Sequence, residues 1–166
     1  MFGLLTWLIL LVAALFVGAL VVRSARKNAL YDQLDLPLSG YRIIGHDLGE
    51  SRTAIKISAF GINGKPDVIA EHKRKRRIRV YDVKARRYSG RVSNYELFQM
   101  TLYVGILRTT RPGYEVEGYL KFRDQVVPVS YSHRLFISLK DLKPEAVQAM
   151  RNWKPINKTP LLARRR

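Results

Sequence analysis

The sequence predicts a compact α/β or α+β domain that is preceded by one transmembrane helix. Three observations predict this fold. Residues 2–22 form an almost unbroken apolar run. Several short segments with the composition of β-strands follow the run, and residues 94–108 carry apolar side chains at helical spacing. Strands mixed with few helices in a chain of 166 residues indicate one compact domain with an added anchor.

The apolar run at the amino terminus has the length of a membrane span. A helix over residues 2–22 extends roughly 31 Å, and the hydrocarbon core of a bilayer is about 30 Å thick. A cleaved signal peptide fits less well, because no Lys or Arg precedes the run and no clean cleavage site follows it. Arg23, Arg26 and Lys27 come directly after the run, and positive flanks stay in the cytoplasm. We therefore expect a single-pass anchor in the cell (inner) membrane, with the remaining chain on the cytoplasmic side.

The elements after the anchor are expected in chain order. Residues 28–38 indicate a linker or a short helix. Asn63-Gly64 is a strong turn signal. Strand composition defines the segments 41–46, 53–62, 67–71 and 78–84.

The second half of the chain combines a helix with shorter elements. In the helix over 94–108, one face holds Tyr95, Phe98, Leu102 and Ile106. The further elements are a hairpin over 115–122 and 126–131, a strand over 133–139 and a final helix over 144–153. The expected organisation is an anchor at 1–22, a linker at 23–39, a domain at 40–155 and a basic tail at 156–166.

The composition narrows the classes of function. Thirty Lys and Arg residues against thirteen Asp and Glu residues give a formal net charge of +17. Such a charge attracts polyanions, and both nucleic acid and anionic lipid headgroups qualify. The chain has no cysteine, which excludes disulfides, thiolate metal sites and cysteine nucleophiles.

Two carboxylates and a lysine form the candidate catalytic group. Asp67 opens one predicted strand, and Asp82-Val83-Lys84 closes the next. A hairpin of these strands places Asp67 opposite Asp82, and the alternation of side chains puts Asp82 and Lys84 on one face. Opposed carboxylates destabilise a sheet, so the pair calls for Lys84 and a bound Mg²⁺ or Mn²⁺ as compensating cations. The alternative is structural, with Asp67 opening a turn and Asp82 paired with Lys84 or an exposed arginine.

The helix after the hairpin adds two polar side chains. Gln99 and Tyr103 are spaced i, i+4 and therefore share one face of the helix. Both side chains can therefore belong to the candidate catalytic group. The alternative is that Tyr103 belongs to the core and that Gln99 is a surface residue.

The motifs G-K-P-D, D-V-K and Q-x-x-x-Y, in this order, resemble the RecB-like exonuclease branch of the PD-(D/E)XK nucleases. This branch includes the exonucleases associated with CRISPR adaptation. The resemblance covers roughly residues 40–132. It implies an α/β fold with a restriction-endonuclease-like mixed β-sheet flanked by helices, and metal-dependent cleavage of DNA. Several relatives carry four cysteines that bind an iron–sulfur cluster, and the absence of cysteine here rules out a cluster of that kind.

The resemblance also implies roles for single residues. Asp67, Asp82 and the main-chain carbonyl of Val83 would bind Mg²⁺ or Mn²⁺, and Lys84 would be the catalytic lysine. Gln99 and Tyr103 would position the substrate strand or the lysine. The family often has an earlier acidic or histidine ligand, for which this chain offers His46 or Glu50.

Basic stretches on either side of the D-V-K motif are candidates for nucleic-acid binding. The alternative is a solvated turn, or one that rests on anionic lipid. The residues are Lys73, Arg74, Lys75, Arg76, Arg77, Arg86 and Arg87.

The sequence thus predicts a membrane-anchored, metal-dependent (exo)deoxyribonuclease that hydrolyses phosphodiester bonds in DNA. One alternative is a membrane-tethered nuclease fold that binds nucleic acid without cleaving it. Another is a tethered scaffold whose basic surface binds anionic lipids.

Overall fold

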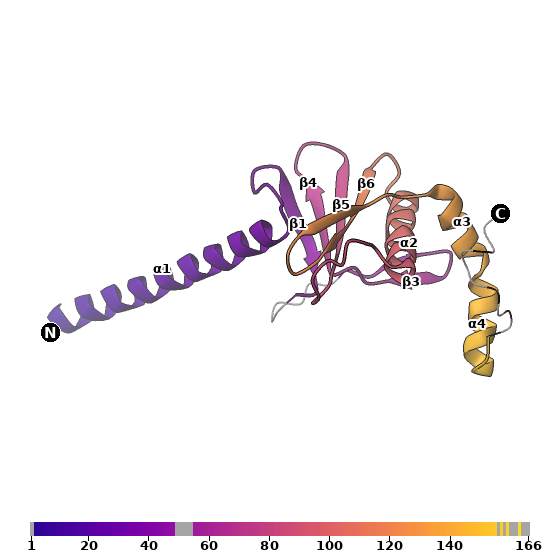
Figure 1. The fold of residues 1–166 in the computed structure, drawn as a ribbon. Coiled ribbons are helices and arrows are strands. Elements are labelled where there is room, and N and C mark those ends of the chain that lie inside the picture. Colours follow the sequence, from indigo (N-terminus) through magenta and orange to yellow (C-terminus); the bar gives the residue numbers. More distant parts are fainter. Residues whose placement is uncertain (1, 49–54, 156, 158, 160–162, 164–166) are drawn as a thin grey trace. The chain divides into compact units, whose positions relative to one another are not determined.

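A computed structural model describes residues 2–48, 55–155, 157, 159 and 163. The chain divides into two compact units, residues 1–40 and residues 41–166, which are treated separately below. The first unit is dominated by helix α1, Phe2–Gln33 (Figure 1), which extends past the apolar run and through Arg23. Among the residues that the structure describes, no helix combines the length and the apolar composition needed to cross a membrane. The predicted transmembrane anchor over 1–22 is therefore not supported.

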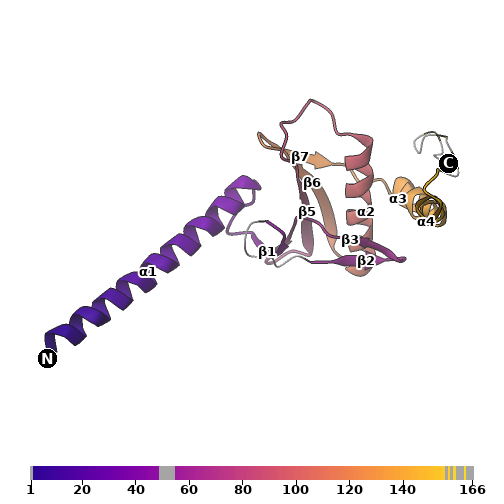
Figure 2. The ribbon, with the colours of Figure 1, turned by 90° about the horizontal axis from the view of Figure 1, so that it is seen from below.

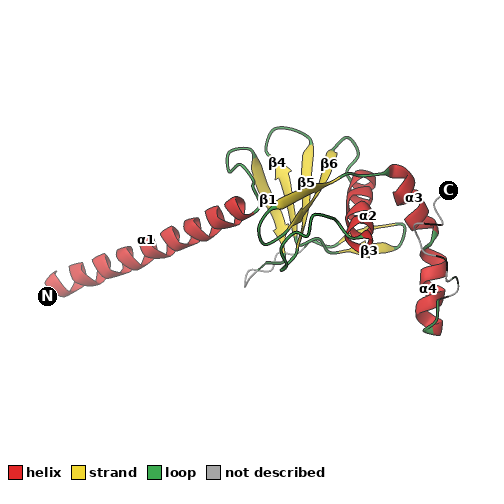
Figure 3. Ribbon diagram, viewed as in Figure 1, coloured by secondary structure: helices red, strands yellow, loops and turns green. Residues whose placement is uncertain are grey.

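The second unit is built on a five-stranded sheet in the order β1-β4-β5-β6-β7. Figure 3 shows β1, β4, β5 and β6 of this sheet. Strands β5 and β6 pair in parallel, and the other neighbours pair antiparallel, so the sheet is mixed as predicted. The strands are β1 Tyr41–His46, β4 Val68–His72, β5 Arg77–Val83, β6 Glu115–Lys121 and β7 Val126–Val129. A separate hairpin joins β2, Ile57–Ala59, to β3, Ile62–Gly64.

Helix α2, Asn94–Thr110, packs against one face of the sheet (Figure 2). Its start is fixed by a capping box, in which the Ser93 side chain accepts from the Glu96 N–H and the Glu96 carboxylate accepts from the Ser93 N–H. Gly118 in β6 allows close packing, because a Cβ there would lie 2.6 Å from Met100 Cγ. The core lies between α2 and the sheet and includes Ile69, Ile78, Val80, Met100, Val104, Val116 and Leu120.

Two local predictions are wrong. The β2–β3 hairpin turns at Phe60-Gly61, where both residues have positive φ, whereas Asn63-Gly64 lies within β3. Residues 133–139 form a helix instead of a strand, namely α3, His133–Asp141. The Ser132 hydroxyl caps α3 by accepting from the Leu135 N–H at 3.3 Å. A final helix, α4, Lys143–Asn152, follows as expected.

Candidate active site

The β4–β5 hairpin brings the two predicted acidic residues to the same place. Val68 is paired with Tyr81, so the same register sets Asp67 opposite Asp82. The Val83 N–H donates to Asp67 Oδ2 at 2.6 Å. The hairpin arrangement predicted from the sequence is therefore confirmed.

The Asp82 carboxylate is buried, with a relative exposure of 5% for the residue. Its Oδ1 accepts from Gln99 Nε2 at 3.1 Å. Its Oδ2 forms an ion pair with the Lys84 ammonium group. The buried charge of Asp82 is therefore compensated by the cation of Lys84, as a buried carboxylate requires.

The Gln99 side chain connects the helix to the hairpin. Besides Asp82, its Nε2 donates to the Tyr103 hydroxyl oxygen at 2.9 Å, and its Oε1 lies 3.4 Å from the Lys84 Nζ donor. The Tyr103 hydroxyl in turn donates to the Lys65 carbonyl at 3.4 Å. The polar side chains predicted from α2 thus meet those of β5, and the i, i+4 spacing produces one continuous hydrogen-bonded group.

The electrostatics of the site reflect two acidic residues, Asp67 and Asp82, that lie close together. Burial raises the pKa of Asp67, the N–H of Val83 opposes this shift, and the nearby charge of Asp82 adds to it. Burial likewise raises the pKa of Tyr103, and the charges of Asp82 and Asp67 act in the same direction. A cation held between the two carboxylates would relieve this repulsion.

A third acidic residue, Asp47, lies beside the pair and was missed by the sequence analysis. The register of β1 with β4 ends at His46 opposite Val68, and the Asp47 N–H donates to the Asp67 carbonyl at 2.9 Å. The Asp47 carboxylate pairs with Lys65 Nζ at 2.5 Å, and its charge raises the pKa of Asp67. Its position directly after a predicted strand was the available signal.

The earlier metal ligand expected from His46 or Glu50 is not found in the described part of the chain. His46 is the last residue of β1, and its Nδ1 lies 3.2 Å from the Leu48 carbonyl. Glu50 lies outside the described residues. Among the described side chains, no three His, Asp and Glu groups are arranged to hold a metal ion. The oxygen donors that fit a hard divalent ion are therefore those of Asp67 and Asp82, together with the Val83 carbonyl.

The basic residues predicted to bind nucleic acid are distributed differently from expectation. Arg86 is held by Glu96 through bonds of 2.7 and 2.9 Å from its Nη2, and its guanidinium stacks over Phe122. Arg77 pairs with Glu115 at 2.6 Å. Both are engaged within the fold, whereas Arg87 is exposed in the loop after Lys84.

The run 73–76 forms the turn between β4 and β5, at the end of the hairpin opposite to the acidic pair. At about 3.3 Å per strand residue, the turn lies roughly 20 Å from Asp67 and Asp82. Closeness in sequence therefore does not make this run part of the acidic site.

The second unit thus combines a mixed sheet, whose central hairpin carries two carboxylates and a lysine, with a helix that supplies a glutamine and a tyrosine. The model of the PD-(D/E)XK nuclease superfamily matches residues 17–157. The chain therefore belongs to the PD-(D/E)XK nuclease superfamily.

The comparisons with solved structures and with curated proteins show weaker similarity or none. The crystal structure of SSO0001 is similar to this chain with a TM-score of 0.42 and 11% sequence identity. The match covers 85% of this chain, which spans 60% of the length of that protein. No curated protein matches the sequence.

Proposed function

We propose that this chain is a divalent-metal-dependent nuclease that hydrolyses phosphodiester bonds in DNA and belongs to the RecB-like branch of its superfamily. The observation that carries the proposal is the buried Asp82 carboxylate, which faces Asp67 and contacts both Lys84 and Gln99. A structural ion pair alone would not need a second carboxylate at this place, because opposed acids destabilise a sheet.

Asp67, Asp82 and the Val83 carbonyl are the proposed metal-binding groups. The Val83 N–H already points at Asp67, and the N–H and C=O of a strand residue point to the same side of the strand. Mg²⁺ and Mn²⁺ suit such oxygen donors. The chemistry that such an ion supplies when bound is polarisation of a phosphoryl oxygen and a lower pKa for an attacking water.

The remaining side chains act on the substrate and on one another. Lys84 places an ammonium group beside the carboxylates, where it stabilises the negative charge that develops on the phosphate. Gln99 holds Lys84 and Asp82 in position through its amide. Tyr103 fixes the rotamer of Gln99 and ties it to the chain at Lys65. These roles for Gln99 and Tyr103 are positioning roles.

The test of this function uses the full chain with end-labelled DNA, in single-stranded and duplex form, and with RNA of the same sequence. We expect cleavage of DNA with Mg²⁺ or Mn²⁺ and none with EDTA, because hydrolysis depends on the ion. Product lengths on gels distinguish removal of terminal nucleotides from internal cuts. Cleavage that persists in EDTA would contradict the proposal.

A second function, nucleic-acid binding without cleavage, is favoured by one observation. Asp47, whose charge acts on Asp67, is paired with Lys65, and the described residues include no three-ligand cluster. Calorimetric titration with Mn²⁺ separates the two functions. Binding that is lost when Asp67 is changed to Asn supports the nuclease, whereas DNA binding with no measurable Mn²⁺ binding supports the inactive form.

The glycine of G-K-P-D provides a further prediction. A Cβ at Gly64 would lie 2.7 Å from Tyr103 Cε1 and 3.2 Å from Ile57 Cγ1. The Gly64→Ala change should push the Tyr103 ring away and disturb Gln99, and we expect the cleavage rate to fall about 10- to 100-fold. Gly18→Ala is the control, because nothing lies within 4 Å of its Cβ position. Equal rates for Gly64→Ala and the native chain would show that Tyr103 does not position the site.

A further inference from the structure

The turn between β4 and β5 consists of four consecutive cations, Lys73, Arg74, Lys75 and Arg76, referred to below as the basic turn (Figure 1). All four residues are exposed. The basic turn has no part in the acidic site, since the length of the hairpin separates the two. Four adjacent cations on one exposed turn produce a positive field that attracts anionic ligands.

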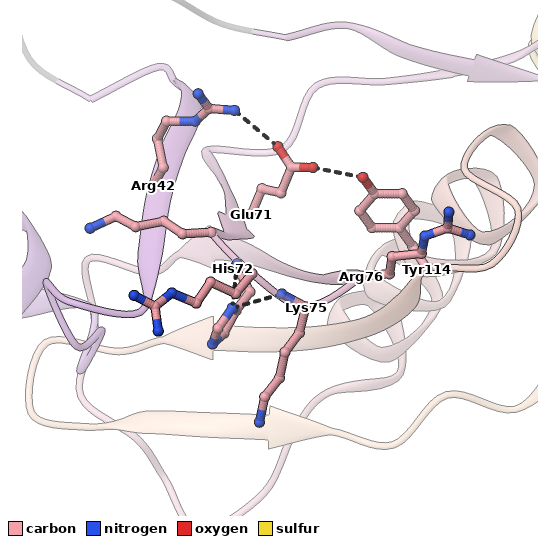
Figure 4. A pocket seen from close by; sticks show the side chains of 8 residues that line it. Arg42, Glu71, His72, Lys75, Arg76 and Tyr114 are labelled. Carbon is pink, nitrogen blue, oxygen red and sulfur yellow. Dashed lines mark hydrogen bonds and ion pairs between the residues drawn. The ribbon is translucent and has the colours of Figure 1, made fainter.

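The basic turn borders an open hollow of about 490 Å³. Figure 4 shows Glu71 between Arg42 and Tyr114 in the wall of this hollow. The Glu71 carboxylate accepts from Arg42 Nη2 at 3.3 Å and from the Tyr114 hydroxyl at 2.9 Å. These bonds hold Glu71 in place. Five cationic residues and one acid line the hollow, so the hollow carries an excess of positive charge.

The backbone of the basic turn is held in a defined shape. His72 Nδ1 accepts from the N–H groups of both Arg74 and Lys75, each at 3.1 Å. Desolvation and the neighbouring cations lower the pKa of His72, so the ring stays neutral and Nδ1 remains an acceptor near pH 7. On the other side, the Glu115 N–H donates to the Arg76 carbonyl at 2.8 Å. A preorganised turn presents its cations at lower entropic cost on binding.

We propose that the basic turn is a second phosphate-binding site, which holds the nucleic-acid substrate away from the bond to be cleaved. This inference rests on the proposed nuclease function and adds a minimum substrate length to it. Lys and Arg side chains contact phosphate oxygens without reading sequence. The separation of roughly 20 Å corresponds to about six base steps of B-form duplex, at about 3.4 Å per step.

A polynucleotide suits this surface better than a lipid bilayer does. The residues around the hollow are charged apart from His72 and Tyr114, and no aliphatic side chain is among them. Interfacial membrane binding needs apolar side chains that enter the acyl region. A chain of phosphates, by contrast, needs only repeated cations along its path.

The first experiment measures binding alone, so its result does not depend on cleavage. Fluorescence anisotropy follows fluorescein-labelled duplexes of about 20 and about four base pairs over a range of KCl concentrations, each made as a hairpin so that its strands stay paired. Changing all four cations of the basic turn to Ala should reduce the slope of log Kd against log salt by about four for the long duplex. The short duplex cannot reach both sites, so its loss of affinity should be clearly smaller.

A matched variant removes the same charge elsewhere, with Lys56, Arg134, Arg151 and Lys154 changed to Ala. We expect it to leave the length dependence unchanged. Equal effects of the two variants on both duplexes would overturn the inference, because they would reflect net charge alone. So would an unchanged salt slope in the basic-turn variant, or a loss of binding to phosphatidylserine vesicles with DNA binding intact.

The second experiment uses the absence of cysteine from the chain. Lys75→Cys then carries a single thiol-attached photocross-linker. On the long duplex, cross-links should centre about six base steps from the bond that the protein cuts in the presence of Mn²⁺. Cross-links spread evenly over the duplex would overturn the inference. If the native chain cuts nothing, the nuclease proposal fails, and the anisotropy result still decides whether the basic turn binds phosphates.

Discussion

Replacing Asp82 by Asn is expected to abolish metal-dependent cleavage, with a loss of about a thousandfold or more. The substitution keeps the size of the side chain and the acceptor for Gln99, whose Nε2 lies 3.1 Å from Oδ1. It removes the negative charge that faces Lys84 and that is proposed to hold the ion. Metal ions contribute several kcal/mol to transition-state stabilisation, and each 1.36 kcal/mol corresponds to about tenfold in rate.

The measurement for Asp82→Asn is the single-turnover cleavage rate of labelled DNA at saturating Mn²⁺, together with the Mn²⁺ affinity by calorimetry. Both should fall. Asp141→Asn is the control, because it removes an equal charge from an exposed acid paired with Lys140. Thermal unfolding of each variant separates loss of fold from loss of chemistry. A folded Asp82→Asn variant that cleaves within about threefold of the native rate would eliminate this site as the catalytic centre.

Changing Lys84 to Met should slow cleavage by about 10² to 10³, the range seen when one donor to a developing negative charge is removed. Met keeps an unbranched chain of similar length but has no charge. The Lys84 side chain is 20% exposed and contacts both Asp82 and Gln99. The ammonium group therefore stands where a phosphate oxygen can reach it while its partners hold it in place.

The Lys84→Met variant has a second readout that distinguishes it from Asp82→Asn. Lys84 competes with a metal ion for the Asp82 carboxylate, so its removal should leave Mn²⁺ affinity unchanged or raise it. The rate should fall all the same. Lys140→Met, in α3, serves as the control for the loss of one positive charge. A fall in Mn²⁺ affinity that matches the fall in rate would show that Lys84 supports the ion instead of the phosphate.

The acidic pair and its helix could be predicted because the relevant information is local. Two strands joined by a short polar turn can pair in few registers, and the alternation of side chains then decides which residues face each other. This reasoning placed Asp67 opposite Asp82. Gln99 and Tyr103 were placed together by the helical repeat, within a helix that starts at a recognisable capping box.

Other local predictions failed where the sequence signals compete. Residues 133–139 have the apolar composition of a strand, but the Ser132 cap and the burial of Leu135 and Phe136 on one side favour a helix. Short apolar segments do not separate these states by periodicity. In the β2–β3 hairpin, the turn formed at Phe60-Gly61 despite the stronger signal at Asn63-Gly64, because pairing of Ile57 with Gly64 draws those residues into the strand.

The sequence by itself determined the acids, the lysine and the helix that supports them, since hairpins and helices obey fixed repeats over a few residues. Only the tertiary structure decided what lies beside them. Asp47 reaches Asp67 because β1 pairs with β4 across an intervening segment. Arg86 forms an ion pair with Glu96. The basic turn is next to the acids in the sequence and far from them in space, because a strand carries the chain away at about 3.3 Å per residue.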